Sequence, residues 1–497
     1  MKKLNRTVFL LGIVMVVIPA LVLAQDVEKK QKKVLKLEKV TVTAPKVEQE
    51  IVLTPSTTTI NVEKYKIPGT PQNIVDILKT LPTIDFRGRS DLVPEYDQMY
   101  MRGFDSMRFS IAIDGMTIQR PGMFGTTQVH FGTLPLWRIE EIEIIPGPHS
   151  ALYWGKSEGG TINLKTKKPH KFLTLKPDIT MESGFRSYGT QIHSFTAEGG
   201  IRSFIYDFGF QHYETDGYLR NNSSDINNYA CRLGYLLPHE GFVTFDVALM
   251  DETQETPVRN KPGDIDYDPD YPDTPEGYWG YWPWQEPERD RKEYSYRLRW
   301  EQPTPIGTWT LAAYYERQDW NRTWLAPGTG WRGPEVEPAF VRSNRYNIQH
   351  RQGGGKIQNR VRLGKHEFTV GFDIVQMWRG SPRSERYSQY GYHKPSHKRA
   401  DLKAIYLQDK WDISPWLTFT GGLRYEYDEL WFYNWDYIHN RPWITGEDYP
   451  FIKRHRNELV PKSFLTCKLD RFSPYLRDTS LSVGISKIWN PIPHCMP

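Results

Sequence analysis

The stretch His366-Glu367-Phe368-Thr369-Val370-Gly371-Phe372-Asp373-Ile374 decides the fold class of this chain, because its side chains alternate in character. Every second residue, from His366 to Ile374, offers an aromatic or aliphatic group to one face. The residues between them are polar or small and share the opposite face. A period of two predicts a β-strand that is apolar on one side only.

The same alternation recurs through the C-terminal two thirds of the chain. Further examples are Tyr206 to Phe210, Val243 to Leu249 and Leu417 to Tyr427. We expect strands of about ten residues, joined alternately by short turns such as 413–416 and by long polar loops at 253–292 and 321–338. This asymmetry is typical of a transmembrane β-barrel with its apolar face in lipid and its polar face on a lumen. A soluble β-sandwich, with the apolar face in a core, is the alternative.

The composition agrees with a barrel. The chain has 497 residues, is 38% hydrophobic and has a mean hydropathy of -0.61, yet 14% of it is aromatic. Disordered chains are poor in aromatic residues, and helical membrane proteins carry long apolar runs. The net charge of +5 comes mostly from the N-terminal lysines and gives no nucleic-acid footprint. The three cysteines, Cys231, Cys467 and Cys495, match no metal-ligand spacing.

The N-terminus has the pattern of an export signal. Basic residues at Lys2, Lys3 and Arg6 precede an apolar run that ends at Ala24. The small residue at Ala24 suits cleavage there, so we expect residues 1–24 to be a signal peptide, with a membrane anchor as the alternative. No later stretch approaches ~18 consecutive apolar residues, so a membrane-spanning part of the mature chain has to be built from strands.

Residues 25–61 are rich in Lys, Glu and Thr and predict a flexible tether. Within it, residues 38–44 alternate β-branched side chains and are followed by Pro45. Such a segment can add as a strand to an exposed sheet edge of a partner protein. An ordinary short strand is the alternative.

Residues 62–169 predict a small α+β domain. Thr70 and Pro71 suit the start of a helix over residues 71–81. Its apolar face contains Ile74, Ile77, Leu78 and Leu81. Strands are expected at 109–113, 139–145 and 161–165, with a turn at Asp114-Gly115.

Several motifs in this domain occur in the order and spacing of one family. They are Asp76-Ile77-Leu78, Leu81-Pro82, Met101-Arg102-Gly103-Phe104, Ile113-Asp114-Gly115, Arg138-Ile139-Glu140, Gly147-Pro148, Ala151-Leu152-Tyr153 and Gly159 to Asn163. The chain thereby resembles the TonB-dependent outer-membrane receptors. The resemblance implies a mainly β protein, with an α+β plug domain (62–169) inside an antiparallel transmembrane β-barrel (170–497). It also implies that the tether at 25–61 is periplasmic and carries a TonB box at 38–44, for which the matching residues are Val40, Thr41, Val42, Thr43 and Ala44.

Two departures from the family pattern lead to further expectations. Pro146-Gly147-Pro148 stands where the family carries Arg-Gly-Pro, and the resemblance implies that this arginine pairs with barrel carboxylates. We therefore expect Arg102 alone to make the plug's ionic contact with the barrel. The family builds about 22 strands, whereas the residues after Pro169 give roughly 14 by alternation. With prolines at 493 and 497 as well, we expect a fragment or a frameshifted product.

The resemblance implies a receptor in the outer membrane of a Gram-negative cell that takes up a scarce ligand with energy delivered through TonB. Its partners would be TonB with its inner-membrane energising complex, outer-membrane lipid and, first among ligands, an iron-siderophore complex; no cofactor is implied. Cobalamin, haem, another metal chelate or an oligosaccharide are alternative cargoes. A passive porin or a surface-binding protein is the alternative class, but neither needs both a plug and a TonB box.

Two groups of residues are candidates for ligand contact. In the plug loops they are Arg87, Arg89, Arg120, Phe124 and His130, whose arginines suit an anionic ferric chelate. In the loop at 253–292 they are Tyr278, Trp279, Tyr281, Trp282 and Trp284, which can stack on a flat chelate or a sugar ring. Solvated loop residues and aromatic residues of a membrane interface are the respective alternatives.

We expect no catalytic residue and no metal site. Ser157 lies in a G-x-S-x-G sequence, but a strand is expected after it, where the nucleophile elbow requires a helix. The aspartates from Asp264 to Asp270 are spaced as in a calcium loop, but Pro269 takes the glycine position, which leaves weak divalent-ion binding as the alternative. His393 and His397 are separated by Pro395, which argues against a helical metal pair.

Overall fold

The computed structural model describes the greater part of the barrel region and about two thirds of the plug. The described ranges are 51–54, 57–62, 74–78, 80–87, 98–105, 108–118, 120–121, 127–128, 136–148, 150–154, 157–169, 176–274, 288–327, 340–383, 397–433, 451–469, 471–476 and 479–489. Two β structures dominate these residues: a small mixed sheet and a long antiparallel one.

The long sheet has thirteen strands, which pair antiparallel in chain order from β11 to β23. The strands are β11 (Asp178–Phe185), β12 (Gln191–Ile201), β13 (Phe204–Thr215), β14 (Ser224–Leu236), β15 (Phe242–Glu255), β16 (Glu288–Thr304), β17 (Gly307–Pro327), β18 (Phe340–Leu363), β19 (His366–Arg383), β20 (His397–Ser414), β21 (Leu417–Tyr433), β22 (Phe451–Lys468) and β23 (Ser480–Ser486). In the described residues β11 and β23 are the two edges and do not pair with each other.

The plug is built on a six-stranded sheet of order β1-β2-β9-β10-β5-β6. Its strands are β1 (Ile51–Thr54), β2 (Thr57–Asn61), β5 (Phe109–Ile113), β6 (Met116–Thr117), β9 (Ile139–Pro146) and β10 (Gly160–Thr166). Two short hairpins, β3 (Ile84–Arg87) with β4 (Gln98–Met101) and β7 (Arg120–Pro121) with β8 (Thr127–Gln128), accompany it. The helix α3 (Ile74–Leu78) and the 3-10 turn η2 (Leu136–Arg138) complete the domain.

Local sequence signals in the plug are confirmed in part. The helix expected over residues 71–81 ends at Leu78, so Leu81 lies in the turn region after it. All four apolar positions, Ile74, Ile77, Leu78 and Leu81, are nevertheless at most 5% exposed and pack into one core with β5, β9 and β10. The turn after β5 has φ of 51° at Asp114 and 77° at Gly115. Two consecutive positive φ angles are what a tight hairpin turn requires, and Asp-Gly supplies them at low cost.

The two faces of the long sheet also follow the alternation. On β19, Val370 and Phe372 are 47% and 41% exposed, whereas Asp373 is 7% exposed on the face toward the plug. On β21, Leu423 is 49% exposed while Arg424 is fully buried. The apolar face therefore points outward and the polar face inward, as expected for a barrel wall.

Strand length is where the expectation of about ten residues is wrong. Strands β16 to β22 contain 17 to 24 residues. The longest, β18, reaches about 80 Å at the usual rise, whereas an apolar band is about 25 Å tall. Backbone pairing continues beyond the apolar band into polar sequence, so residues 253–255, 288–292 and 321–327, expected in loops, lie in strands.

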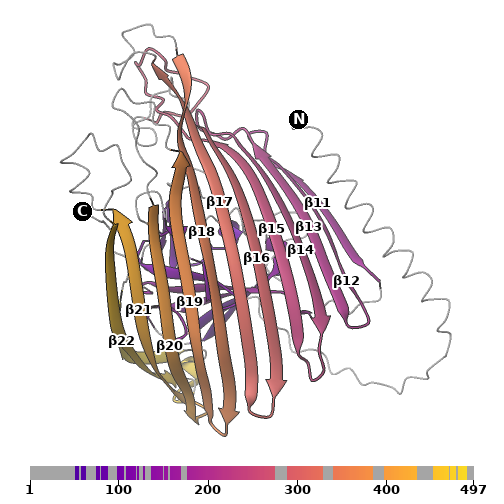
Figure 1. The fold of residues 1–497 in the computed structure, drawn as a ribbon, viewed down its shortest axis with the longest axis vertical. Helices are drawn as coiled ribbons and strands as arrows, with labels where there is room; N and C mark the ends of the chain where they lie inside the picture. Colours follow the sequence, from indigo (N-terminus) through magenta and orange to yellow (C-terminus); the bar gives the residue numbers. More distant parts are fainter. Residues whose placement is uncertain are drawn as a thin grey trace, which may run out of the picture.

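The plug lies against the inward face of the long sheet. Figure 1 shows the indigo and purple plug strands behind the curved sheet, with the short turns of the sheet at the foot of the view. Contacts between β6 or β7 and strands β18 and β19 join the two structures. Within the described residues, no helix is long and apolar enough to cross a membrane.

The fit between plug and sheet is close at Gly209 of β13. A Cβ built on Gly209 would overlap the Trp137 ring of η2. We expect Gly209→Ala to displace Trp137 and to destabilise the folded chain by about 1–3 kcal/mol, because overpacking a tight contact forces side-chain and backbone shifts.

Gly355→Ala on β18 is the matched control, because a Cβ there meets its nearest atom at an ordinary 3.6 Å. Thermal unfolding of both variants in the same detergent tests the contact. Equal midpoints for the two variants would contradict it.

Candidate functional site

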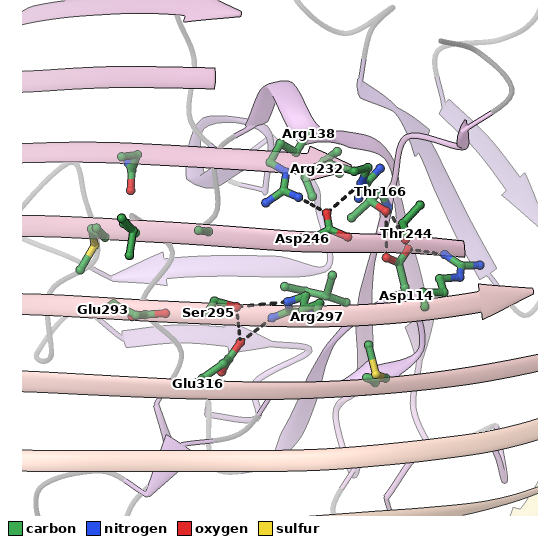
Figure 2. Close-up of a pocket in the computed structure, with 18 of the residues that line it drawn as sticks. Asp114, Arg138, Thr166, Arg232, Thr244, Asp246, Glu293, Ser295, Arg297 and Glu316 are labelled. Atoms are coloured by element: carbon green, nitrogen blue, oxygen red, sulfur yellow. Dashed lines mark hydrogen bonds and ion pairs between the residues drawn. The ribbon is translucent and has the colours of Figure 1, made fainter. Parts of the chain in front are cut away.

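The plug is held to the sheet by a buried ionic cluster centred on Asp246 of β15. Arg138 at the end of η2 donates through Nη2 to Asp246 Oδ1. Arg232 of β14 donates to the same oxygen at 2.7 Å and, through Nη1, to the plug carbonyl of Lys167 at 2.8 Å. All three charged residues are less than 10% exposed (Figure 2). One carboxylate thus joins a plug arginine to a barrel arginine.

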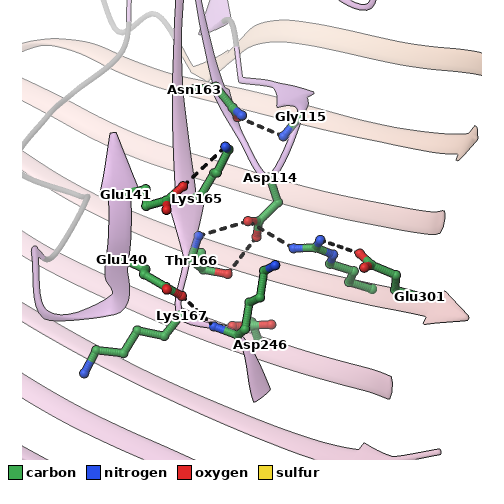
Figure 3. A network of polar contacts seen from close by, with 12 residues as sticks. Asp114, Gly115, Glu140, Glu141, Asn163, Lys165, Thr166, Lys167, Asp246 and Glu301 are labelled. Atoms are coloured by element: carbon green, nitrogen blue, oxygen red, sulfur yellow. Dashed lines mark hydrogen bonds and ion pairs between the residues drawn. The ribbon is translucent and has the colours of Figure 1, made fainter. Parts of the chain in front are cut away.

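A second ionic contact is made by Asp114, in the turn after β5. Its carboxylate accepts hydrogen bonds from the Thr166 backbone N–H at 2.9 Å and the Thr166 hydroxyl at 2.8 Å (Figure 3). Arg299 of β16 lies 3.1 Å from it. Burial would raise the pKa of Asp114, but Arg299 and the hydrogen bonds from Thr166 outweigh it and hold the pKa below its ordinary value. The carboxylate is therefore ionised at neutral pH.

A cavity separates these two contacts and is lined from both sides by charged groups. The plug contributes Asp114 and Arg138, and the sheet contributes Arg297 with its ion-pair partner Glu316 (Figure 2). Charged groups of both signs, from the plug and from the sheet, therefore line the same space.

The third contact is centred on Arg424 of β21, which is fully buried. Its Nη2 donates to Asp373 at 2.8 Å and its Nε to Glu426 at 2.8 Å. Its Nη1 lies 3.4 Å from the plug carbonyl of Ala151, and its guanidinium lies 4.6 Å from the centre of the Trp154 ring. The sheet supplies the cation here, and the plug supplies a carbonyl and an aromatic face.

Other sheet side chains bind the plug backbone in the same manner. Those that donate to plug carbonyls are Lys462 to Ser150 at 2.7 Å, Tyr314 to Thr117 at 2.8 Å and Lys356 to Gly115 at 3.2 Å, while Gln408 accepts from the Ala151 N–H at 3.1 Å. Side-chain to backbone bonds of this kind fix the position of the plug whatever its own side chains are. The arrangement therefore holds a separate domain in place through many individually modest bonds.

The expectation that Arg102 alone provides the ionic contact is wrong. Arg102 is exposed in a turn with φ of 53°, whereas Arg138 and Asp114 carry ion pairs to the sheet. In the loop that follows Pro146, the plug meets a cation of the sheet, because Arg424 donates to the Ala151 carbonyl. A direct contact of Arg102 with the barrel stays a prediction.

The remaining expected site residues are only partly described. Arg87 and Arg120 belong to β3 and β7, and the structure describes their backbones alone. The others lie outside the described residues: Val40 to Ala44, Arg89, Phe124, His130, Tyr278, Trp279, Tyr281, Trp282 and Trp284. Their roles stay predictions.

Sequence reasoning missed Arg232, Asp246, Arg299, Asp373 and Arg424. A usable signal was present, because each is a charged residue at an inward position of a strand whose outward positions are apolar. Within the described residues, no group of three or more His, Cys, Asp or Glu side chains is placed to hold a metal ion. Ser157 is 2% exposed and donates to the Trp154 carbonyl at 3.1 Å, and the strand expected after it is present as β10.

A small α+β domain held against the polar face of a long antiparallel sheet, whose other face is apolar, defines a plug-and-barrel membrane protein. Residues 51–161 match the TonB-dependent receptor plug domain, and residues 210–491 match the TonB-dependent receptor-like β-barrel. The chain belongs to the TonB-dependent receptor family, whose members are outer-membrane receptors and transporters.

Several known proteins are similar to this chain. The vitamin B12 transporter BtuB of Vibrio vulnificus (strain YJ016) is 29% identical over 162 residues, which are 31% of this chain and 25% of that protein. Among solved structures, the copper transporter OprC superposes with a TM-score of 0.65 at 16% identity, covering 87% of this chain and 64% of that one. The siderophore receptor PiuA from Acinetobacter baumannii gives 0.58 at 14% identity, covering 84% and 62%. The chain thus spans a quarter of the matched curated relative and less than two thirds of these two structures.

Proposed function

We propose that this chain is a receptor for TonB-dependent uptake of a scarce extracellular ligand, with an iron-siderophore complex as the leading cargo. Cobalamin, haem, another metal chelate or an oligosaccharide are the alternatives on the same scaffold. Similarity to proteins named for vitamin B12, copper and siderophores supports the class of cargo without selecting among its members. Arg87, Arg89 and Arg120 are the proposed contacts for an anionic chelate.

The observation that carries this proposal is the docking of the plug through the buried Arg138–Asp246 ion pair and the Asp114–Arg299 ion pair. Separating a buried charge from its partner costs about 3–5 kcal/mol, so such a plug stays closed without an external input. Residues 25–61 are the proposed tether, and Val40 to Ala44 are the proposed strand that pairs with TonB. A pull on the tether would then supply the work that the closed plug requires.

The proposed signal peptide and the apolar outer face of the sheet are consistent with export of the chain to the outer membrane. We propose that residues 1–24 are removed on export, and that residues 62–169 and 170–497 form the plug and the barrel region. The outward apolar face, with Val370, Phe372 and Leu423 exposed, suits contact with lipid.

Val42→Pro tests the proposed function. A proline in the middle of the pairing segment removes a backbone donor and disfavours the added strand, so we expect TonB-dependent uptake to fall to the level of a strain lacking the gene. Uptake is measured with radiolabelled iron supplied as single purified siderophores to iron-limited cells.

Val47→Pro, in the same tether but outside the box, is the control and is expected to retain uptake. Undiminished uptake by Val42→Pro would refute the TonB box. Equal growth with and without the intact gene on every siderophore tested would exclude iron as the cargo.

A further inference from the structure

A second pocket lies away from the plug interface, at the end of strands β11 to β14 that carries the turns 186–190 and 216–223. It has a volume of about 200 Å³. Its strand residues Tyr213, Ser224 and Gln254 fall on the inward faces of their strands, because they are an even number of residues from the plug-facing Asp207, Arg232 and Asp246. Gln254 is eight residues beyond Asp246 on β15, or about 26 Å. The pocket therefore opens on the lumen near the mouth, well beyond the ionic cluster.

The floor of this pocket is tied together by its own hydrogen bonds. The Thr190 hydroxyl donates to the Ser187 carbonyl at 2.7 Å and lies 2.7 Å from the Thr215 hydroxyl. The Asp216 N–H donates to the Tyr188 carbonyl at 2.9 Å, which joins the two turns. A wall fixed in this way loses little conformational entropy on binding.

Two buried polar groups on the pocket wall lack partners. Asn222 and Ser224 are 5% and 6% exposed, and neither Asn222 Oδ1 nor Ser224 Oγ has a hydrogen-bond partner in the described part of the chain. A buried polar atom without a partner costs about 1–3 kcal/mol. Solvent does not reach either atom in this orientation, but both side chains line the pocket, and a rotation that turns the polar atom toward the cavity would let an occupant with hydroxyl groups supply the missing partner.

The other lining residues restrict the chemistry of that occupant. None of the described residues that line the pocket has a carboxylate, so the lining disfavours a cation. Arg186 is the single basic residue among them, so an anion would find few cationic partners. Most of the lining residues carry a hydroxyl or an amide group beside apolar surface. Tyr188 and Tyr218 stand at the rim with ring centres 6.0 Å apart, and Tyr188 is 59% exposed. Neutral hydrogen-bonding groups beside aromatic faces suit a ring with one apolar face and hydroxyls at its edge.

We propose that this pocket binds a neutral sugar ring, with Asn222 and Ser224 receiving its hydroxyl groups and the rim tyrosines contacting its apolar face. The proposal rests on the proposed function in one respect: the sugar reaches this pocket from outside the cell because the chain is an outer-membrane receptor. The sugar is either a free saccharide or a glycosyl group carried on an iron chelate, since both present the same ring to the pocket.

The binding test uses the full chain in a detergent without sugar headgroups, such as LDAO. The probes are methyl α-glucopyranoside, methyl α-galactopyranoside and methyl α-mannopyranoside, followed by saturation-transfer NMR with titration. We expect saturable binding of at least one of them. Asn222→Ala or Ser224→Ala should weaken it about two- to tenfold, the equivalent of one hydrogen bond. Tyr188→Ala, at an exposed position, should weaken it as well.

Ser194→Ala on the inward face of β12, outside the pocket lining, is the matched control and should bind normally. Absence of binding by all three probes, or binding unchanged in the Asn222, Ser224 and Tyr188 variants, would overturn the proposal. A glycosylated ferric catecholate that binds more tightly than its sugar-free form, with the difference lost in Ser224→Ala, identifies the chelate as the source. No such difference, with the methyl glycosides still bound, identifies a free saccharide. The assay needs neither TonB nor transport, so its failure is distinct from failure of the Val42→Pro experiment.

Discussion

Replacing Asp246 with alanine is expected to release the plug from the sheet. The change leaves Arg138 and Arg232, which are 9% and 3% exposed, without the carboxylate that both contact. The buried Asp207 still attracts both guanidinium groups, but it makes no ion pair with either of them in the described residues. Removing one partner of a buried ionic contact destabilises by about 3–5 kcal/mol. The Lys167 carbonyl still accepts from Arg232, but it does not neutralise either guanidinium. The loss of stability should therefore weaken the docking of the plug more than it weakens the strand pairing of the long sheet.

Hydrogen–deuterium exchange measures this effect on the plug strands β5 and β10. At about 1.4 kcal/mol per tenfold change, the amides of these strands should exchange at least a hundredfold faster in Asp246→Ala. Asp251→Ala is the control on the same strand, because the Asp251–Lys292 pair is more than half exposed on both sides and such pairs contribute at most about 1 kcal/mol. Equal protection of β5 and β10 in both variants would show that the cluster does not hold the plug.

Arg424→Met is the second change with a large expected effect. It leaves the carboxylates of Asp373 and Glu426 buried without their shared cation, and it removes the bond to the Ala151 carbonyl. We expect a destabilisation of about 3–5 kcal/mol, because methionine occupies much of the volume of the arginine side chain but carries no charge. Adding Asp373→Asn and Glu426→Gln to the same chain should restore a large part of the stability.

Urea unfolding of the refolded chain, followed by tryptophan fluorescence, measures the difference. Arg399→Met is the matched control, since Arg399 pairs with Asp401 two residues along its strand as Arg424 does with Glu426, but its side chain is 44% exposed. A loss in Arg424→Met no larger than in Arg399→Met would contradict the role assigned to Arg424. Failure of the triple variant to recover would show that Arg424 acts through packing on Trp154 more than through charge.

The sequence predicted those parts of the fold that depend on local periodicity. Alternation with a period of two correctly assigned Phe372 to the outward face of its strand and Asp373 to the inward face. A helical spacing placed Ile74, Ile77 and Leu78 in a core, and Asp114-Gly115 predicted the turn after β5. Each of these features, the strand faces, the helix face and the turn, depends on residues only a few positions apart in the sequence. The limits of the strands were missed because pairing with neighbouring strands extends them into polar sequence that carries no periodic signal.

By itself the sequence determined the fold class, the sidedness of the strands and, through the ordered plug motifs, the family. The tertiary structure decided which residues meet across the plug interface. Arg138 and Asp246 are 108 residues apart, and Arg424 and Ala151 are 273 residues apart. Periodicity shows that a charged side chain points inward but not which side chain it meets, because the partner is fixed by strand register and by the position of the plug. The ionic contact expected of Arg102 is therefore made by Arg138 and Asp114. The sheet supplies the ion pairs of Arg232 and Arg424 by itself, whereas the contacts of Arg138 with Asp246 and of Ala151 with Arg424 depend on how the plug and the sheet pack against each other.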